Sequence, residues 1–205
     1  MLRVAGRRAV VVGGGEVAAR RARALAEVEA AVTVVAPTVS GAIVELQERG
    51  MVEVERRGFE ERDCRGAFIV VAATGDPSVN ERVAAAAREA GALVNRADAP
   101  EEGDLVVPAH RRVGPITVAV ATGGASAAAA ATLVNGCIAS IDEAWVAVLE
   151  AAGEFRPRVQ ARFAKGEARR RALRAMTDGA AFEAYRRGGE AGLRDHLERI
   201  LDHAE

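Results

Sequence analysis

Three polar side chains follow apolar runs of the sequence and could meet at one ligand site. Thr74 follows the run AFIVVAA, Asn95 ends the run ALVN, and Asp98 comes three residues later. Because ligands of open α/β sheets bind beyond the carboxyl ends of the strands, we expect these side chains to face a common crevice. A hydroxyl or an amide can hydrogen-bond a cofactor, and the Asp98 carboxylate can accept a proton. By sequence alone, however, an aspartate two residues before a proline is more often a turn former than a functional residue.

A glycine-rich turn, VVVGGGEVA, opens the first strand–helix unit. Read as G-x-G-x-x-A, it places Gly13, Gly15 and Ala18 at the positions of a dinucleotide fingerprint. Gly13 permits a tight turn, Gly15 lets the backbone approach a pyrophosphate, and Ala18 allows close helix–strand packing. The following helix N-terminus offers its N–H groups to phosphates. We therefore predict a nicotinamide dinucleotide site. The segment APT at residues 36–38 has no acidic residue for the ribose, so spacing alone leaves NAD and NADP open.

Three further segments each have a binding and a structural interpretation. Thr74 could contact the cofactor, while the neighbouring Asp76 could cap a helix that Pro77 starts. The glycines of TGGAS, residues 122–126, could approach an anionic ligand, but a tight turn with Ser126 as the helix N-cap is favoured. The basic run at residues 110–112 is more typical of a solvated hairpin turn than of a binding site.

Strand and helix patterns alternate through the first hundred residues. The expected strands are Arg8–Val12, Val32–Ala36, Val52–Glu55, Ala67–Ala73 and Ala92–Asn95. The expected helices are Glu16–Ala30, Ser40–Arg49 and Pro77–Ala90. Strands separated by helices at this spacing predict an α/β fold with a Rossmann-like, doubly wound parallel sheet.

The pattern changes after Pro100. Two strand-like runs, Asp104–Pro108 and Ile116–Ala121, are joined by the basic turn His110–Gly114, and a helix-prone stretch follows from Ser126. From residue 155 the chain is helical in composition. We therefore predict three parts: a dinucleotide-binding domain at residues 1–112, a small segment at 113–150 and a helical C-terminal domain at 151–205. The small segment is too apolar to stand in solvent and needs a cover.

Composition limits the classes of function. Half of the 205 residues are apolar, and 28 Lys and Arg nearly balance 29 Asp and Glu, so no global field for nucleic acid or membranes is expected. Cys64 and Cys137 lie far apart, which indicates a reducing compartment, and the histidines do not cluster, so no metal site is predicted. No stretch approaches the roughly 20 apolar residues of a membrane span. We expect a cytoplasmic protein.

The order of several motifs resembles the precorrin-2 dehydrogenase family of siroheme biosynthesis, which includes the dehydrogenase/ferrochelatase module of siroheme synthase. The motifs are GGGEVAARRARAL, VTVVAP, ATGDPSVN, LVNRADAPEEGDLVVPA and GPITVAVATGGAS. The resemblance implies an NAD-dependent oxidoreductase that converts precorrin-2 to sirohydrochlorin, and a homodimer with residues 113–150 as the dimerisation segment. Some members also insert ferrous iron, and this ferrochelatase (lyase) activity stays open. The alternative is a non-catalytic dinucleotide- or tetrapyrrole-binding module.

The resemblance also assigns roles to residues. It implies that Asp98 is the catalytic acidic residue. It implies cofactor contacts from Gly13, Gly14, Gly15, Glu16, Val17, Ala36, Pro37, Thr74 and Asn95. A tetrapyrrole substrate carries many carboxylates, which arginine is suited to bind. The substrate contacts expected on this basis are Arg96, Arg111 and Arg112, and Gly124 and Ser126 of the TGGAS turn are expected to contact the substrate as well.

The sequence departs from the family pattern in three places. Ser126 is followed by five alanines where a proline and a Leu-Ala-Arg run are usual. Glu29 replaces a glycine before the second strand, and Arg96 with Ala97 stands where apolar residues are usual. We expect these departures to bear on catalysis and chelation more than on cofactor binding.

Overall fold

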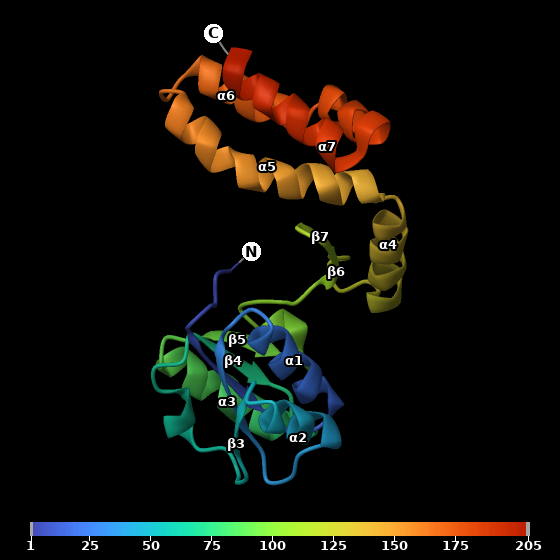
Figure 1. Ribbon diagram of the computed structural model, residues 1–205. Coiled ribbons are helices and arrows are strands. Elements are labelled where there is room, and N and C mark those ends of the chain that lie inside the picture. Colours follow the sequence, from blue (N-terminus) through green and yellow to red (C-terminus); the bar gives the residue numbers. More distant parts are fainter. Residues whose placement is uncertain (1, 204–205) are drawn as a thin grey trace. The chain divides into compact units, whose positions relative to one another are not determined.

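The central strands of the first half are valine- and alanine-rich runs that can be buried on both faces, as is typical of a parallel sheet. The structure is a computed structural model that describes residues 2–203. The sheet has the order β3-β2-β1-β4-β5, and every neighbouring pair is parallel (Figure 1). Its strands are β1 (Arg8–Val12), β2 (Ala31–Val35), β3 (Glu53–Glu55), β4 (Ile69–Ala72) and β5 (Leu93–Arg96). The predicted doubly wound parallel sheet is confirmed.

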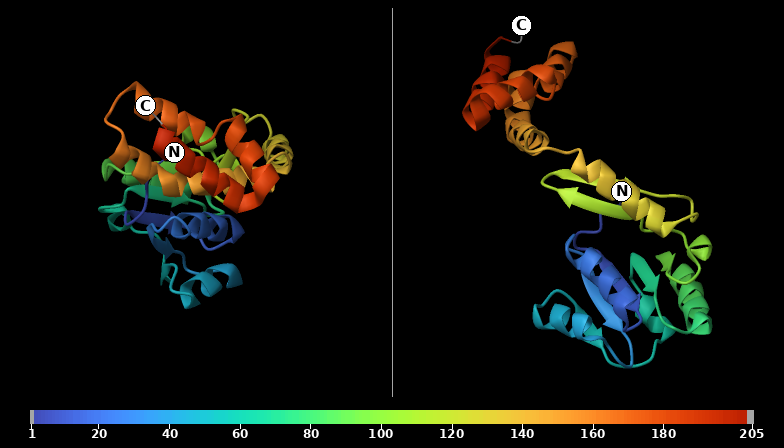
Figure 2. Two further views of the ribbon diagram at one scale, coloured as in Figure 1. Left: turned by 45° about the horizontal axis from the view of Figure 1, so that its top comes forward. Right: turned by 90° about the vertical axis from the view of Figure 1, so that its right-hand side faces the viewer.

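Alternate side chains of β1 enter two different cores. Val11 belongs to the core that α1 (Glu16–Ala26) and α2 (Gly41–Glu48) close, whereas Val10 belongs to the core closed by α3 (Pro77–Glu89). Helices therefore cover both faces of the sheet, α1 and α2 on one and α3 on the other (Figure 2). This explains why the central strands are apolar throughout and do not alternate with polar residues.

The chain leaves the centre of the sheet in two directions. It runs from β1 to β2 and β3 on one side, then returns to β4 and continues to β5 on the other. Two 3-10 helices, η1 (Glu61–Cys64) and η2 (Pro100–Glu102), lie in the connections before β4 and after β5. In open sheets, the point where the strand order reverses is where ligands bind, outside the carboxyl ends of the strands. Here that point lies between β1 and β4.

The chain divides into two compact units between Val107 and Pro108. As far as residue 203, the second unit contains an antiparallel hairpin, β6 (Ala109–Val113) and β7 (Ile116–Val120), with α4 (Ala127–Ala139) packed on it. Then follow α5 (Glu143–Arg162), α6 (Glu167–Ala175) and α7 (Gly179–His203), which share one apolar core. The helical C-terminal region is as predicted.

Within α7 the chain bends at Gly189, whose φ is +61°. Between residues 2 and 203 no single helix is both long and apolar enough to cross a bilayer. The helices α4 and α5, which are bent by 79° relative to each other, together have the length and composition of a membrane span.

One expected strand is wrong. Asp104–Pro108 forms no strand, and the hairpin begins at β6, so the basic residues 110–112 lie in a strand and not in the turn. The backbone N–H groups of Asp104 and Leu105 instead donate to the carbonyl of Val94, at 2.8 and 3.1 Å. The Asp104 carboxylate in turn accepts from the Val94 N–H at 3.0 Å. These contacts hold the segment against β5 as an irregular connection.

Candidate functional site

The glycine turn between β1 and α1 is shaped by close contacts with two other loops. Gly13 has φ +134°, and a Cβ there would lie 2.3 Å from the carbonyl oxygen of Ala73, beyond β4. A Cβ on Gly14 would lie 1.8 Å from the carbonyl oxygen of Thr38, beyond β2. At Gly15, by contrast, a Cβ would meet open space. The turn therefore packs tightly on the loops after β2 and β4 and leaves Gly15 open to a ligand.

A cavity of about 1010 Å³ lies over this turn, at the carboxyl ends of β1, β2 and β4. Of the nine predicted cofactor residues, eight line it: Gly13, Gly14, Gly15, Glu16, Val17, Ala36, Pro37 and Thr74. Thr38, Ser40, Phe59, Gly75 and Arg82 line it as well and had not been predicted. The cavity is large enough for a cofactor-sized ligand.

Two observations fit a dinucleotide in this cavity. The N-terminus of α1 begins at the open Gly15 and presents backbone N–H groups that a pyrophosphate can accept. The Ser40 hydroxyl is buried and has no hydrogen-bond partner among the described residues, so it offers a donor and an acceptor to a ligand. The loop after β2, residues 36–40, contains no carboxylate. The ribose would therefore meet the backbone groups of this loop and the Ser40 hydroxyl.

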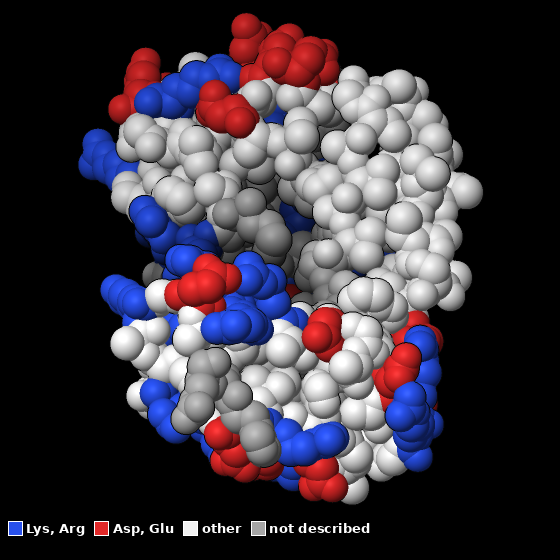
Figure 3. All heavy atoms as spheres, turned by 90° about the horizontal axis from the view of Figure 1, so that it is seen from above, with Lys and Arg blue, Asp and Glu red and all other residues white. Residues whose placement is uncertain are grey.

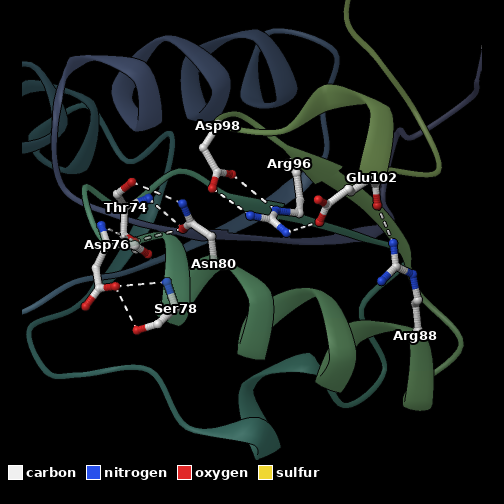
Figure 4. A network of polar contacts seen from close by, with 8 residues as sticks. All are labelled: Thr74, Asp76, Ser78, Asn80, Arg88, Arg96, Asp98 and Glu102. Atoms are coloured by element: carbon white, nitrogen blue, oxygen red, sulfur yellow. Dashed lines mark hydrogen bonds and ion pairs between the residues drawn. The ribbon is translucent and has the colours of Figure 1, made fainter.

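Asp76 and Thr74 have separate roles after β4. Asp76 accepts from the N–H of Ser78 at 2.9 Å and caps α3, and Pro77 occupies the first turn, as predicted. Thr74 lines the cavity and is held by Asn80 of α3. The Thr74 N–H donates to Asn80 Oδ1 at 3.0 Å, and Asn80 Nδ2 donates to the Thr74 carbonyl at 3.2 Å (Figure 4). The side chain of Asn80 therefore fixes the backbone of the cavity wall.

Asn80 was missed by the sequence reasoning, although the sequence contains a signal for it. The residue is fully buried, and it lies one turn before Val83 and Ala84 on the apolar face of α3. A polar residue at such a position must find partners inside the protein. An asparagine on the apolar face of a helix therefore predicts a buried polar contact.

Asp98 lies beyond the end of β5, at the same edge of the sheet as the cavity. The Ala97 N–H still donates to the carbonyl of Ala72 at 3.0 Å, which keeps this end of the chain against β4. Asp98 does not line the cavity itself, and its side chain is 26% exposed. Asn95 is buried and does not line the cavity either; its Nδ2 donates to the carbonyl of Leu105 at 2.9 Å. Its cofactor contact stays a prediction.

The carboxylate of Asp98 is paired with Arg96. Arg96 Nη2 lies 2.7 Å from Asp98 Oδ2, and Nε lies 3.2 Å from Oδ1. Arg96 also donates to the Glu102 carboxylate (Figure 4). The hydrogen bonds from Arg96, supported by the amide of Asn80, lower the pKa of Asp98 to about 2. Asp98 is therefore an anion at any ordinary pH.

The remaining predicted substrate residues belong to the second unit. Arg111 and Arg112 are exposed on β6, where each donates one hydrogen bond to a backbone carbonyl. Gly124 has φ +85° in the turn before α4. Ser126 caps α4 by accepting from the Ala129 N–H at 3.1 Å, the interpretation that the sequence favoured. Their contacts with substrate stay predictions.

The next features are the two cysteines and the possible metal ligands of the described residues. Cys64 is buried and Cys137 exposed, and both are free thiols. Burial raises the pKa of the Cys64 thiol to about 11, which makes it a poor nucleophile. Residues 2–203 contain no group of three or more His, Cys, Asp or Glu side chains placed to hold a metal ion.

Comparison with known proteins identifies the kind of chain. A family described as "Putative NAD(P)-binding" matches residues 1–109, and one described as "Sirohaem synthase dimerisation region" matches residues 144–201. Siroheme synthase of Methylococcus capsulatus is 36% identical over 94% of this chain and 40% of its own length. Siroheme synthase of Pseudomonas entomophila is 36% identical over 97% of this chain and 43% of its own length. The chain thus spans about two fifths of these relatives.

A solved structure is similar over nearly its whole length. SirC, a precorrin-2 dehydrogenase, superposes with a TM-score of 0.79 at 30% identity, and the match covers 99% of this chain and 98% of SirC. The similarity includes both the sheet with its glycine turn and the helical second unit. This chain therefore belongs to the precorrin-2 dehydrogenase family, which includes the corresponding module of siroheme synthase.

Proposed function

We propose that this protein catalyses the NAD-dependent dehydrogenation of precorrin-2 to sirohydrochlorin. The observation that carries the proposal is the arrangement at one sheet edge. A glycine-lined cavity lies at the switch point between β1 and β4, and the ionised carboxylate of Asp98 lies beyond β5 at the same edge. The similarity to SirC and to the siroheme synthases supports the choice of substrate. The family description of residues 1–109 supports a nicotinamide dinucleotide as cofactor.

In this proposal the cavity residues bind and orient the cofactor. The N–H groups at the start of α1, beside Gly15, hold the pyrophosphate, and the Ser40 hydroxyl hydrogen-bonds the adenosine side. Thr74, fixed by Asn80, forms the wall after β4. NAD, when bound, supplies the acceptor for the hydride. We therefore propose that every predicted residue that lines the cavity contacts the cofactor.

Asp98 serves the substrate in this proposal. Loss of a hydride leaves positive charge on the macrocycle, and a fixed carboxylate stabilises that charge. The dehydrogenation also releases one proton. A carboxyl group with a pKa of about 2 holds a proton only briefly at neutral pH. Because the Asp98 side chain is 26% exposed, it can pass that proton to water.

We infer that the substrate carboxylates bind Arg111 and Arg112. Both guanidinium groups are exposed on β6 and keep most of their N–H donors beyond the backbone bonds described above. We also infer a homodimer, because residues 144–201 match a dimerisation region. The proposed dimerisation segment at residues 113–150 overlaps the start of that match.

The test is NADH formation from precorrin-2 under anaerobic conditions, with NAD and NADP in parallel. We expect turnover with NAD, and a loss of at least about 100-fold in kcat/KM for Asp98→Asn. Glu48→Gln, which removes an exposed carboxylate of α2, is the matched control. No turnover by the wild-type protein that still binds NAD would favour the non-catalytic module. Ferrous iron added with sirohydrochlorin tests chelation, which requires iron insertion faster than the uncatalysed reaction.

A further inference from the structure

Arg96 is an arginine in a place where charge is costly. It ends β5, and its side chain is only 7% exposed. A buried guanidinium is stable only when charged or polar groups satisfy it. Arg96 meets this requirement with two carboxylates, those of Asp98 and Glu102, drawn on either side of it in Figure 4. Hydrogen bonds to groups of the same chain therefore involve all three nitrogens of its guanidinium.

The contact with Asp98 is bidentate. Two nitrogens of Arg96, Nε and Nη2, each face one carboxylate oxygen, at 3.2 and 2.7 Å. A bidentate pair fixes the plane of a carboxylate as well as its position. Asp98 itself remains 26% exposed, so one part of the carboxylate is held inside the protein while another part stays accessible.

The other partner, Glu102, is held in place by the fold. It ends η2, which folds back onto β5 after Pro100. A Cβ on Gly103 would lie 3.1 Å from the Val94 carbonyl, so this connection passes close over the strand. Arg88 of α3 donates to the carbonyl of Glu102 (Figure 4). The connection after η2 thus keeps the second carboxylate against Arg96.

Two neighbouring side chains favour an ionised Asp98: Arg96 faces it from β5, and the amide of Asn80 faces it from α3. Arg96 is itself surrounded by carboxylates, and the hydrogen bond to Asp98, with the charges of Glu102 and Glu81, raises its pKa. The hydrogen bonds from Arg96 are the largest cause of the low pKa of Asp98. Removal of Arg96 would leave the amide of Asn80 as the remaining support of the Asp98 charge among these groups.

We propose that Arg96 is a positioning residue for the dehydrogenation, in that its buried guanidinium holds the Asp98 carboxylate ionised and in one orientation toward the substrate. The inference rests on the proposed function. It gives Arg96 a different role from the substrate contact that the sequence led us to expect, because two carboxylates of the protein already accept hydrogen bonds from its guanidinium. It also predicts that activity does not depend on the titration of Asp98 in the range where the enzyme works.

The test compares Arg96→Met, Arg96→Lys and Arg65→Met by the pH profile of kcat/KM and by carbon NMR titration of Asp98 in the ligand-free protein. For the wild-type protein we expect no acid limb from Asp98 above about pH 4. For Arg96→Met we expect the limb and the NMR titration to move up by at least about one pH unit, with kcat/KM reduced about tenfold to hundredfold. Arg96→Lys keeps the charge but loses the bidentate contact. It should therefore have the pH profile of the wild type, with a kcat between those of Arg96→Met and the wild type.

Arg65→Met is the matched control, because Arg65 is an exposed arginine of the same unit outside the polar network drawn in Figure 4; its profile should equal that of the wild type. An acid limb and an NMR titration that stay at their wild-type positions in Arg96→Met would overturn the inference while the proposed function stands. Absence of wild-type turnover would overturn the proposed function and with it the positioning role of Arg96 in catalysis. The NMR titration would then still decide whether Arg96 holds Asp98 ionised. Arg96→Lys supplies the comparison if Arg96→Met does not fold.

Discussion

At the scale of single residues, each of the three glycines in the turn between β1 and α1 has a different environment. Gly13 has a backbone conformation that L-residues rarely adopt and lies against the loop after β4. Gly14 has no room for a side chain because the loop after β2 touches it. Gly15 has an ordinary φ of −86° and open space beside it. Contacts within the protein therefore account for the first two glycines, and we propose that the third is required by the ligand.

This difference predicts distinct outcomes for two alanine substitutions. Gly15→Ala should leave the thermal stability nearly unchanged and weaken NAD binding at least about tenfold, because the new Cβ occupies the space for the pyrophosphate. Gly14→Ala should lower stability, because its Cβ would collide with the Thr38 carbonyl. Calorimetric titration with NAD and thermal unfolding would measure both effects. Gly41→Ala, at another open position, is the control. Unchanged NAD affinity in Gly15→Ala would argue against this placement of the pyrophosphate.

The low pKa of Asp98 also predicts how stability depends on pH. Arg96 lowers the pKa of Asp98 in the folded protein to about 2, below the value near 4 of an unfolded chain. The folded protein therefore binds a proton at Asp98 less tightly than the unfolded chain does. The resulting stabilisation is fully present above about pH 4 and is lost as the pH falls toward about 2.

Asp98→Asn should accordingly be less stable than the wild-type protein at neutral pH, with a difference that shrinks as the pH falls from about 4 to about 2. Urea unfolding at several pH values would measure the difference. Glu48→Gln serves as the comparison, since it removes an exposed carboxylate of the same unit. A difference that is constant across this pH range would contradict the pairing of Asp98 with Arg96.

At the scale of elements, the sequence was informative where local patterns decide the structure. The strands, the Asp76–Pro77 start of α3 and the Ser126 cap of α4 follow from apolar runs and from capping residues, which act within a few positions. The strand expected at Asp104–Pro108 does not form, because contacts between residues distant in sequence determine the conformation there. Its backbone N–H groups donate to the carbonyl of Val94 in β5. The partners of Arg96 and Asn80 could not be predicted for the same reason. They depend on how β5, η2 and α3 meet.

The contact between α3 and the loop after β4 predicts a large effect of Asn80→Ala. The substitution removes the acceptor of the Thr74 N–H and leaves part-buried backbone groups without partners. We expect a loss of about 1–3 kcal/mol in the free energy of unfolding, together with weaker NAD binding, because Thr74 lines the cavity. Denaturant unfolding and calorimetry would measure these quantities. Glu81→Ala, exposed at the next position of the same helix, should change stability by less than about 0.5 kcal/mol.

At the scale of the whole molecule, the second unit has more exposed apolar surface than a solvated appendage would need. The 13 residues of α4 include no charged side chain, and Leu133 on this helix is 54% exposed. Trp145, at the start of the matched dimerisation region, is 44% exposed and stacks edge-on against Phe182. Figure 3 shows a broad area without charged side chains on the side where α4 lies. A partner copy of the chain would cover such a surface.

The proposed homodimer can be tested by placing one charge in this surface. We expect the wild-type protein to sediment as a dimer at micromolar concentration, and Leu133→Glu to raise the dissociation constant at least about tenfold, because a carboxylate would have to be buried without a partner. Val28→Glu, at an apolar position of the first unit that is 47% exposed, is the matched control and should remain dimeric. A wild-type monomer would contradict the dimer. A Leu133→Glu dimer of unchanged affinity would instead exclude Leu133 from the interface and leave residues 144–201 to supply it.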